Sequence, residues 1–489
     1  MNDLTALSAS RLCDRLCDGS VTAMDALDAF EQRYREYNPA LNAIISTDFD
    51  AARKRAGEAD AARSRGERWG PLHGLPMTLK DNIETAHLPT SYGVADWRDY
   101  RPPTHADVAQ LVTEAGAIIF GKTNLPALGT DTQTFNEVHG QTNNPWNLAY
   151  TPGGSSGGAA AALAAGLTPL EIGNDIGGSI RLPAHFCGLY GHKASYGLVS
   201  AHGPKPWEAE HANFPVDADL LSTGPLARSA RDLGLALDVV AGPASNQRTA
   251  LRAQLADSRA HSLGDFRVGV WLEEAGYETD SATGDVLQRA VDALANAGAN
   301  IVARRPNLSL QRSHQLRNEL EATTLSYTYP QDTYDWALQN AQETPPGRSA
   351  LTWAQSVSMR CRDWHSIHHE RLIIQQQWHE YFQSVDVLLC PVARINAHEH
   401  DHTPITERSI DFCGESSRYW PIIGPWNALA LVAYLPATVA PVGQTPNGLP
   451  VGLQIVGPYM EDRTPIRFAE LIEEHITGEF QFPDGFAPR

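Results

Sequence analysis

Two loops rich in glycine and serine constrain this chain more than any other part of its sequence. The first reads Pro-Gly-Gly-Ser-Ser-Gly-Gly at 152–158, and the second reads Asp-Ile-Gly-Gly-Ser-Ile-Arg-Leu-Pro at 175–183. Their serines Ser155 and Ser179 stand 24 residues apart. Glycines let backbone N–H groups approach a ligand closely, and serine supplies a hydroxyl nucleophile. The pair of loops therefore predicts acyl-transfer chemistry.

Short apolar runs alternate with amphipathic segments, which is typical of an α/β layer architecture. Buried strands are expected at 74–79, 117–122, 170–174, 267–272, 300–303, 385–391 and 449–457. Helices are expected at 4–36, 48–68 and 107–116, in the alanine-rich run after Gly158, at 282–297 and over most of 305–384. Ser20 is a candidate N-cap of a second helix, and Trp353, Trp364 and Trp378 are candidate anchors of helices to the core. No repeat or linker divides the chain, so one large domain is the simplest organisation.

Composition indicates a soluble protein and excludes several classes of function. The net charge of −19 has the wrong sign for a protein that neutralises nucleic-acid phosphates. The first twenty residues lack the apolar core of a signal peptide, and the apolar stretch 159–167 is too short to span a bilayer. Six scattered cysteines without metal-ligand spacing are typical of a reducing compartment. We expect a cytoplasmic protein that binds no nucleic acid, membrane or metal.

Further motifs surround the two loops in a fixed order. They are His-Gly-Leu-Pro-Met-Thr-Leu-Lys-Asp-Asn at 73–82, Gly-Lys-Thr-Asn at 121–124, Asn-Pro-Trp at 144–146, Leu-Ser-Ala at 7–9, Asn-Pro-Ala-Leu-Asn-Ala at 38–43 and Leu-Pro-Val-Gly-Leu-Gln at 449–454. With the glycine–serine loops, they make the chain resemble the amidase signature family everywhere except roughly 245–380.

The resemblance implies a large mixed central β-sheet covered by helices on both faces. It also implies a single domain over 1–489, with a helical N-terminal region at about 1–70. The core is expected at about 71–240 and 385–475, and a variable, mostly helical insert at about 245–384.

By its motifs, the resemblance also implies a Ser-Ser-Lys catalytic triad. Ser179 corresponds to the nucleophile, Ser155 to a bridging serine next to a cis peptide at Gly154–Ser155, and Lys80 to the base. A serine hydroxyl needs a base, and lysine serves as one only when it is neutral. Lys80 follows an apolar run, where desolvation would lower its pKa. A proton would then pass from Ser179 to Ser155 to Lys80 and return to the leaving amine.

The second loop also offers donors for the oxyanion that forms during acyl transfer. We expect the oxyanion hole to consist of the backbone amides of Ile176, Gly177 and Gly178, with that of Ser179. Three polar side chains are expected to hold this loop by hydrogen bonds: Ser156, Asp175 and Arg181.

A substrate-facing loop is implied after Thr-Asn-Leu-Pro at 123–126, with Gly129, Thr130 and Thr132 as substrate-binding residues. Lipid-amide members of the family have bulky apolar residues there, so the small residues of this chain argue against a long acyl group. The insert 305–384, Tyr419-Trp420 and Trp426-Asn427 are expected to complete the pocket, with Trp426 beside an aryl or hydrophobic group.

The leading function is hydrolysis of a small carboxylic amide, and possible further substrates are esters, anilides and carbamates. No cofactor is expected, and the protein is expected to be a monomer or homodimer. The alternative is a glutamine-hydrolysing component of a tRNA-dependent amidotransferase. The presence of Lys80, Ser155 and Ser179 argues against a non-catalytic relative.

Three other interpretations fit single motifs. Gly-Gly-Ser-Ser-Gly at 153–157 matches the nucleophile elbow of α/β-hydrolases, but the residues before it make a poor central strand. A phosphate-binding loop would need a following Gly-Lys-Ser/Thr, which is missing. His398, His400 and His402 suggest a metal site, but alternation in a proline-rich loop is more typical of a solvated segment.

Overall fold

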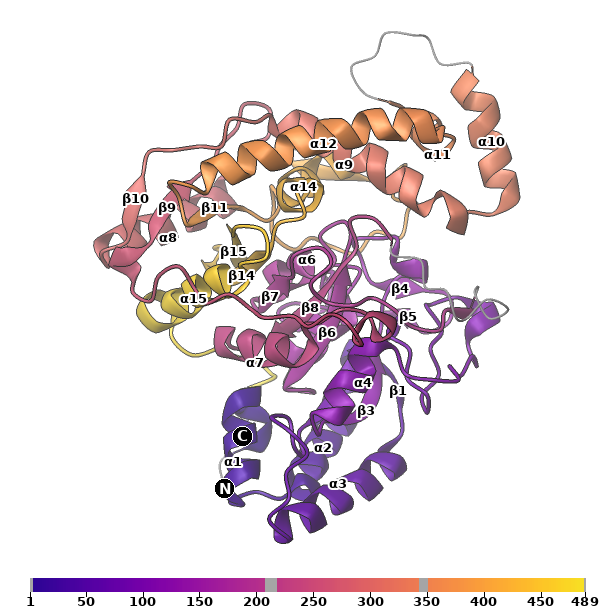
Figure 1. The fold of residues 1–489 in the computed structure, drawn as a ribbon, viewed down its shortest axis with the longest axis vertical. Helices are drawn as coiled ribbons and strands as arrows, with labels where there is room; N and C mark the ends of the chain where they lie inside the picture. The colour runs from indigo at the N-terminus through magenta and orange to yellow at the C-terminus, as the bar shows by residue number, and fades with distance from the viewer. Residues whose placement is uncertain (1–2, 207–217, 343–350, 488–489) are drawn as a thin grey trace.

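A mixed sheet of eight strands forms the centre of the computed structural model, which describes residues 3–206, 218–342 and 351–487 (Figure 1). The strand order is β10-β9-β11-β15-β14-β7-β8-β6. The neighbours β10, β9 and β11 are parallel, and every other pair is antiparallel. These strands are β6 Leu170–Asp175, β7 Tyr190–Lys193, β8 Ser222–Ala227, β9 Arg267–Val270, β10 Asn300–Val302, β11 Val387–Pro391, β14 Ala437–Gln444 and β15 Pro450–Val456.

A three-stranded sheet, ordered β1-β3-β2, lies beside the β6 edge of the large sheet. Hydrogen bonds from the backbone and hydroxyl of Thr78 in β2 to Thr168 and Glu171 join the two sheets. The remaining strands are β1 Ile44–Thr47, β2 Pro76–Lys80, β3 Ile118–Thr123, and the two short pairs β4 Phe135–Asn136 with β5 Gly140–Gln141 and β12 Ser409–Phe412 with β13 Glu415–Arg418.

Helices cover both faces of the large sheet because its central strands are apolar on both sides. In β11, Val387 and Leu389 pack with α7, α8 and α15, whereas Leu388 and Cys390 pack with α9, α12 and α14. Successive side chains of a strand point to opposite faces, so this alternation requires a helical layer on each side. The expected mixed α/β fold with a large helix-covered sheet is confirmed.

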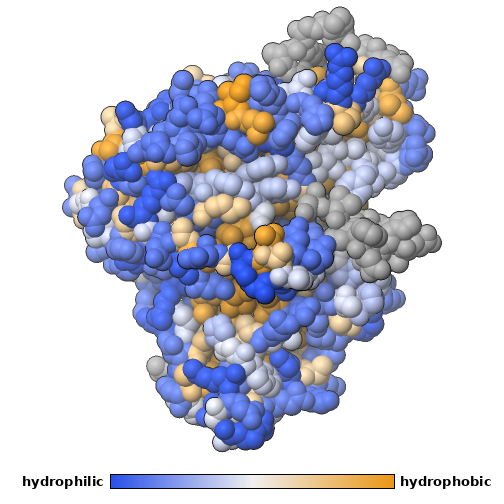
Figure 2. Space-filling view, in the orientation of Figure 1, coloured by the Kyte–Doolittle hydropathy of each residue, from blue (hydrophilic) through white to orange (hydrophobic). Residues whose placement is uncertain are grey.

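The helices run as follows: α1 Ala9–Asp18, α2 Ala23–Leu41, α3 Phe49–Ser64, α4 Asp107–Glu114, α5 Gly157–Ala164, α6 Arg181–Cys187, α7 Ala230–Val240, α8 Ser281–Asn296, α9 Leu310–Leu325, α10 Gln331–Gln342, α11 Trp353–Val357, α12 Cys361–Tyr381, α13 Trp420–Ile423, α14 Pro425–Val432 and α15 Arg463–Ile472. Within the described residues, none of them combines the length and the apolar character that a bilayer span requires. In the view of Figure 2 the surface is mostly hydrophilic, with scattered hydrophobic patches.

The N-terminal helices begin at clear capping residues. Thr22, not Ser20 as predicted, caps α2, where its side chain accepts from the backbone of Asp25 and the Asp25 side chain accepts in return. This reciprocal pair satisfies two backbone donors that Ser20 lies too far upstream to reach. The C-terminal segment packs against these helices, since Arg11 pairs with Glu479 at 2.5 Å (Figure 1).

The expected helical insert contains α8 to α12, and its residues 343–350 lie outside the described part of the chain. Trp378 is fully buried and anchors α12 to the core as expected. Trp353 is not an anchor, because 44% of it is exposed and it contributes to the wall of a large cavity.

Candidate active site

Three segments that are distant in the sequence bring the two loop serines and Lys80 together. Lys80 ends β2, Ser155 lies in the turn before α5, and Ser179 lies between β6 and α6. Both serines line a cavity of about 740 Å³, and Lys80 lies behind Ser155, fully buried. The Lys80 Nζ donates to Ser155 Oγ at 2.7 Å and to Asn174 Oδ1 at 2.8 Å.

Burial controls the charge of Lys80. Desolvation lowers the pKa of Lys80 to about 7, although the carboxylates of Asp175 and Glu171 oppose this change. A neutral lysine amine accepts a proton, whereas the protonated ammonium group does not. Lys80 is therefore able to act as a base near neutral pH, as its position after an apolar run predicted.

The expected cis peptide is present between Gly154 and Ser155. The chain around it is closely packed, because a Cβ on Gly154 would stand 2.7 Å from the carbonyl oxygen of Asp131. Glycine is required at 154 for this close approach of two backbone segments.

The loop 175–180 is organised by the carboxylate of Asp175. Its oxygens accept from the amides of Gly178 at 2.8 Å and Ile180 at 3.1 Å. The predicted use of the Gly178 amide in the oxyanion hole is therefore wrong, because this N–H already donates its hydrogen bond to Asp175. The amides of Ile176, Gly177 and Ser179 have no acceptor among the described residues. The hydroxyl of Ser179 also has no partner there, and it borders the cavity.

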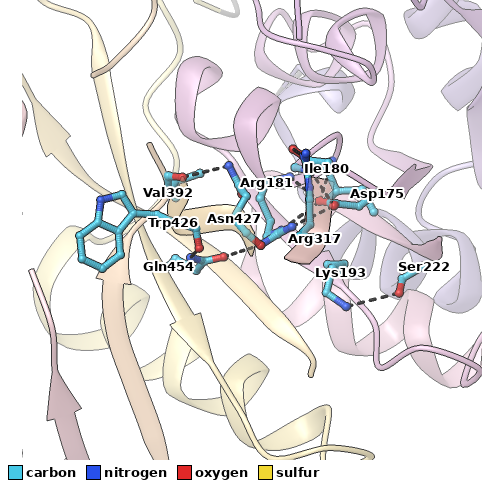
Figure 3. Close-up of polar contacts among 12 residues, drawn as sticks. Asp175, Ile180, Arg181, Lys193, Ser222, Arg317, Val392, Trp426, Asn427 and Gln454 are labelled. Atoms are coloured by element: carbon cyan, nitrogen blue, oxygen red, sulfur yellow. Dashed lines mark hydrogen bonds and ion pairs between the residues drawn. The ribbon is translucent and has the colours of Figure 1, made fainter. Parts of the chain in front are cut away.

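Arg181 holds Asp175 in place, as expected. Figure 3 shows Arg181 between Asp175, at 2.9 Å, and the pair Asn427 and Gln454, at 3.0 and 2.7 Å. Burial raises the pKa of Asp175, but the guanidinium of Arg181 outweighs it and brings that pKa to about 2. Asp175 thus remains a carboxylate, and a fully paired one.

Ser156 contacts this loop differently from the prediction. Its backbone N–H donates to the carbonyl of Ser179 at 3.1 Å. Its buried hydroxyl has no hydrogen-bond partner among the described residues, so the side chain does not hold the loop.

The predicted substrate-facing residues divide into two groups. Gly129, Thr130 and Thr132 all line the cavity, and a Cβ on Gly129 would stand only 3.4 Å from Ser155 Oγ. Trp426 is fully buried in the core and packs edge-on against Trp271, so its predicted place in the pocket is wrong.

Trp420 lines the cavity, as predicted, and sequence reasoning missed two residues close to it. Glu321 also lines the cavity, and Arg317 lies under the ring of Trp420, 4.7 Å from its centre. Arg317 and Glu321 are one turn apart on α9, in the part of the chain that carries none of the family motifs, so nothing in the sequence marked them. Asn174 was missed too, although it directly precedes the second loop.

Of the three alternating histidines, His400 and His402 contact each other, with ring centres 6.3 Å apart. His398 Nε2 lies 3.0 Å from the hydroxyl of Tyr419, and the ring of His402 stacks on Phe135. Across 3–206, 218–342 and 351–487, no three His, Cys, Asp or Glu side chains gather as metal ligands would.

Comparison with known proteins places the chain among amidases and amidotransferase subunits. The model of the Amidase family matches residues 25–465. A glutamyl-tRNA(Gln) amidotransferase subunit of Synechococcus sp. (strain CC9605) is 30% identical, over 96% of this chain and 97% of the relative. The corresponding subunit of Streptomyces coelicolor is 29% identical, over 99% of this chain and 98% of the relative.

Solved structures share the fold at lower identity. A bacterial aryl acylamidase of the amidase signature enzymes superposes with a TM-score of 0.81 at 23% identity, over 99% of both chains. The glutamyl-tRNA(Gln) amidotransferase subunit of Thermotoga maritima gives 0.78 at 23% identity, over 98% of both chains. A 6-aminohexanoate cyclic dimer hydrolase gives 0.79 at 24%, over 99% of this chain and 100% of that one.

Proposed function

The chain belongs to the amidase signature family, whose members act on amide C–N bonds, and we propose that it is a self-sufficient hydrolase of small carboxylic amides. The observation that carries the proposal is the contact of 2.7 Å between Ser155 Oγ and Lys80 Nζ, a lysine whose pKa of about 7 lets it accept a proton.

In the proposed reaction, Ser179 Oγ attacks the amide carbonyl carbon and its proton passes through Ser155 to neutral Lys80. The free amides of Ile176, Gly177 and Ser179 stabilise the oxyanion, and each such donor contributes about 2.7–4 kcal/mol. The proton then returns through Ser155 to the leaving amine as the C–N bond breaks. Water hydrolyses the resulting acyl-enzyme along the same proton path, and esters, anilides and carbamates would form the same type of intermediate.

The cavity walls favour an uncharged aromatic or apolar group in the substrate. Leu325, Tyr329, Trp353, Ile405 and Trp420 all line it. Such side chains contribute mainly through apolar burial and ring contacts. An aryl or alkyl group distant from the scissile bond would fit these walls.

The second candidate is a glutamine-hydrolysing amidotransferase component, favoured by the relatives at 30% identity. Glutamine carries an α-carboxylate that needs a cation. Among the described residues of the cavity wall, the only lysine is Lys205, which pairs with Glu84 at 3.0 Å, and no arginine is present. The described wall therefore favours the first candidate.

A panel of amide, anilide, ester and carbamate substrates tests the proposal on the purified chain. Ser179→Ala and Ser155→Ala should each lower kcat/KM by at least about a thousandfold. Ser156→Ala is the matched control, because that neighbouring hydroxyl has no partner among the described residues, and it should retain activity within a few-fold. Failure of the purified chain on the whole panel, together with glutamine hydrolysis in the presence of added partner proteins, would establish the second candidate instead.

A further inference from the structure

Four carboxylates line the cavity beside the two serines: Glu84, Asp131, Glu319 and Glu321. In the first three, both oxygens are engaged by described residues. Their partners are Tyr92 and Lys205 for Glu84, Arg408 for Asp131 and Arg312 for Glu319.

Glu321 differs from the other three. Its Oε2 accepts from Arg317 Nη1 at 2.8 Å, and its Oε1 has no hydrogen-bond partner among the described residues. Arg317 is completely buried, whereas 20% of the Glu321 side chain is exposed, on the side of the cavity. One oxygen of this carboxylate is therefore open to a ligand.

That open oxygen lies next to the loop that would receive the carbonyl group of a substrate. A Cβ on Gly177 would stand 3.3 Å from Glu321 Oε1, and Arg317 Nη2 donates to the Gly177 carbonyl at 3.3 Å. The leaving nitrogen must face Ser155, which returns its proton. Glu321 contacts the loop from α9 at Gly177, so an acyl portion placed against Gly177 would reach its open oxygen.

The charges around Glu321 favour a cation as its partner. Burial and the nearby negative charge of Asp175 raise the pKa of Glu321, and Arg317 opposes them from one side only, so a cation bound at the other oxygen would stabilise the ionised carboxylate. Lys205, the one lysine in the described cavity wall, is already paired with Glu84, so this wall offers no lysine to the open oxygen of Glu321. Because Glu321 Oε1 is open to the cavity, a charged donor supplied by the substrate can take the place of water there, and a hydrogen bond to a charged group is stronger than a neutral one.

We propose that Glu321 is a specificity-determining residue that binds an ammonium group on the α or β carbon of the acyl portion, so that amides of amino acids are the preferred substrates. This inference rests on the proposed amide hydrolysis. Glu321 contributes through the acceptor Oε1, and Arg317 fixes the carboxylate through Oε2.

Three matched probes test the inference: 3-phenylpropanamide, phenylalaninamide and 3-amino-3-phenylpropanamide. We expect the wild-type enzyme to prefer at least one of the two amino amides by about tenfold or more in kcat/KM, the size of one charged hydrogen bond. Glu321→Gln should abolish that preference. Glu319→Gln, which removes a carboxylate already held by Arg312, should keep it.

The pH dependence gives a second measurement that needs no variant. The preference of the wild-type enzyme should decline as pH rises through the pKa of the substrate amine, about 8. Equal kcat/KM for all three probes, a preference unaffected by Glu321→Gln, or one that persists at pH 10 would each overturn the inference. Activity that survives Ser179→Ala would instead refute the proposed function, so the two failures are distinguishable.

Discussion

Replacing Asn174 by aspartate tests whether a neutral Lys80 is the base. Asn174 Oδ1 accepts from Lys80 Nζ at 2.8 Å, so Asn174→Asp places a carboxylate against that nitrogen with almost no change of shape. Opposite unit charges 4 Å apart interact by about 4 kcal/mol at an effective dielectric constant of 20, which corresponds to about three pKa units. Since burying the new carboxylate offsets part of this energy, we expect the pKa of Lys80 to rise by about two units.

The sign of the effect on activity follows from the form of Lys80 that reacts. With a pKa of about 7, half of the wild-type enzyme has neutral Lys80 at pH 7. A rise of two units leaves roughly 1% neutral at that pH, so kcat/KM should fall about fiftyfold and recover near pH 10. Wild-type activity should rise from pH 5 and level off above pH 8.

The assay is kcat/KM for one amide from pH 5 to 10 with wild-type enzyme, Asn174→Asp and the uncharged control Asn174→Ala. The control removes the acceptor without adding charge, so its midpoint should not move upward. A midpoint that remains near 7 in Asn174→Asp, or activity lost equally at every pH, would refute Lys80 as the titrating base.

Two further substitutions probe the framework of the site. Asp175→Asn should destabilise the protein by about 3–5 kcal/mol, measured by chemical denaturation, because it leaves the buried charge of Arg181 uncompensated; a loss below 1 kcal/mol would contradict this role. Gly158→Ala should destabilise by several kcal/mol or prevent folding, since its Cβ would stand 2.3 Å from the backbone nitrogen of Asn124. Gly57→Ala in α3 is its control: nothing lies within 4 Å of that Cβ, and helix propensity predicts a stabilisation of about 1 kcal/mol. Equal melting temperatures for the two alanine variants would show that the close approach at Gly158 is misjudged.

The strands that could be predicted most directly from the sequence are those with continuous runs of apolar residues. The runs at 74–79, 117–122 and 385–391 correspond to β2, β3 and β11, because continuous apolar residues leave few other structures possible. The strands β7, β8 and β14 were not predicted. Tyr-Gly-His-Lys in β7 and Ser-Thr-Gly-Pro-Leu-Ala in β8 contain glycine, proline and polar residues, and only pairing within the sheet makes them strands.

Side chains of the site could be predicted where a motif carried them and not where only packing places them. Arg317 and Glu321 look like an ordinary surface ion pair at i, i+4, and their contact with Gly177 depends on how α9 crosses the sheet. The sequence alone did not distinguish which of Trp420 and Trp426 lines the cavity. The break between α13 and α14 near Pro425 separates them, so that one lines the cavity and the other enters the core.

The backbone amides of the second loop show why counting donors along a glycine-rich segment overestimates an oxyanion hole. Each amide has one hydrogen, and the nearest acceptor takes it. Gly178 has φ 108°, a conformation that favours glycine, and its N–H points to Asp175 at 2.8 Å rather than to a substrate. This bond leaves Ile176, Gly177 and Ser179 as free donors, because Arg181 keeps the acceptor ionised and in place. The motif Asp-Ile-Gly-Gly-Ser-Ile-Arg therefore contains the residues that hold its own backbone in place. Asp175 accepts the amide hydrogen of Gly178 and so orients the remaining amides of the loop, and Arg181 holds Asp175.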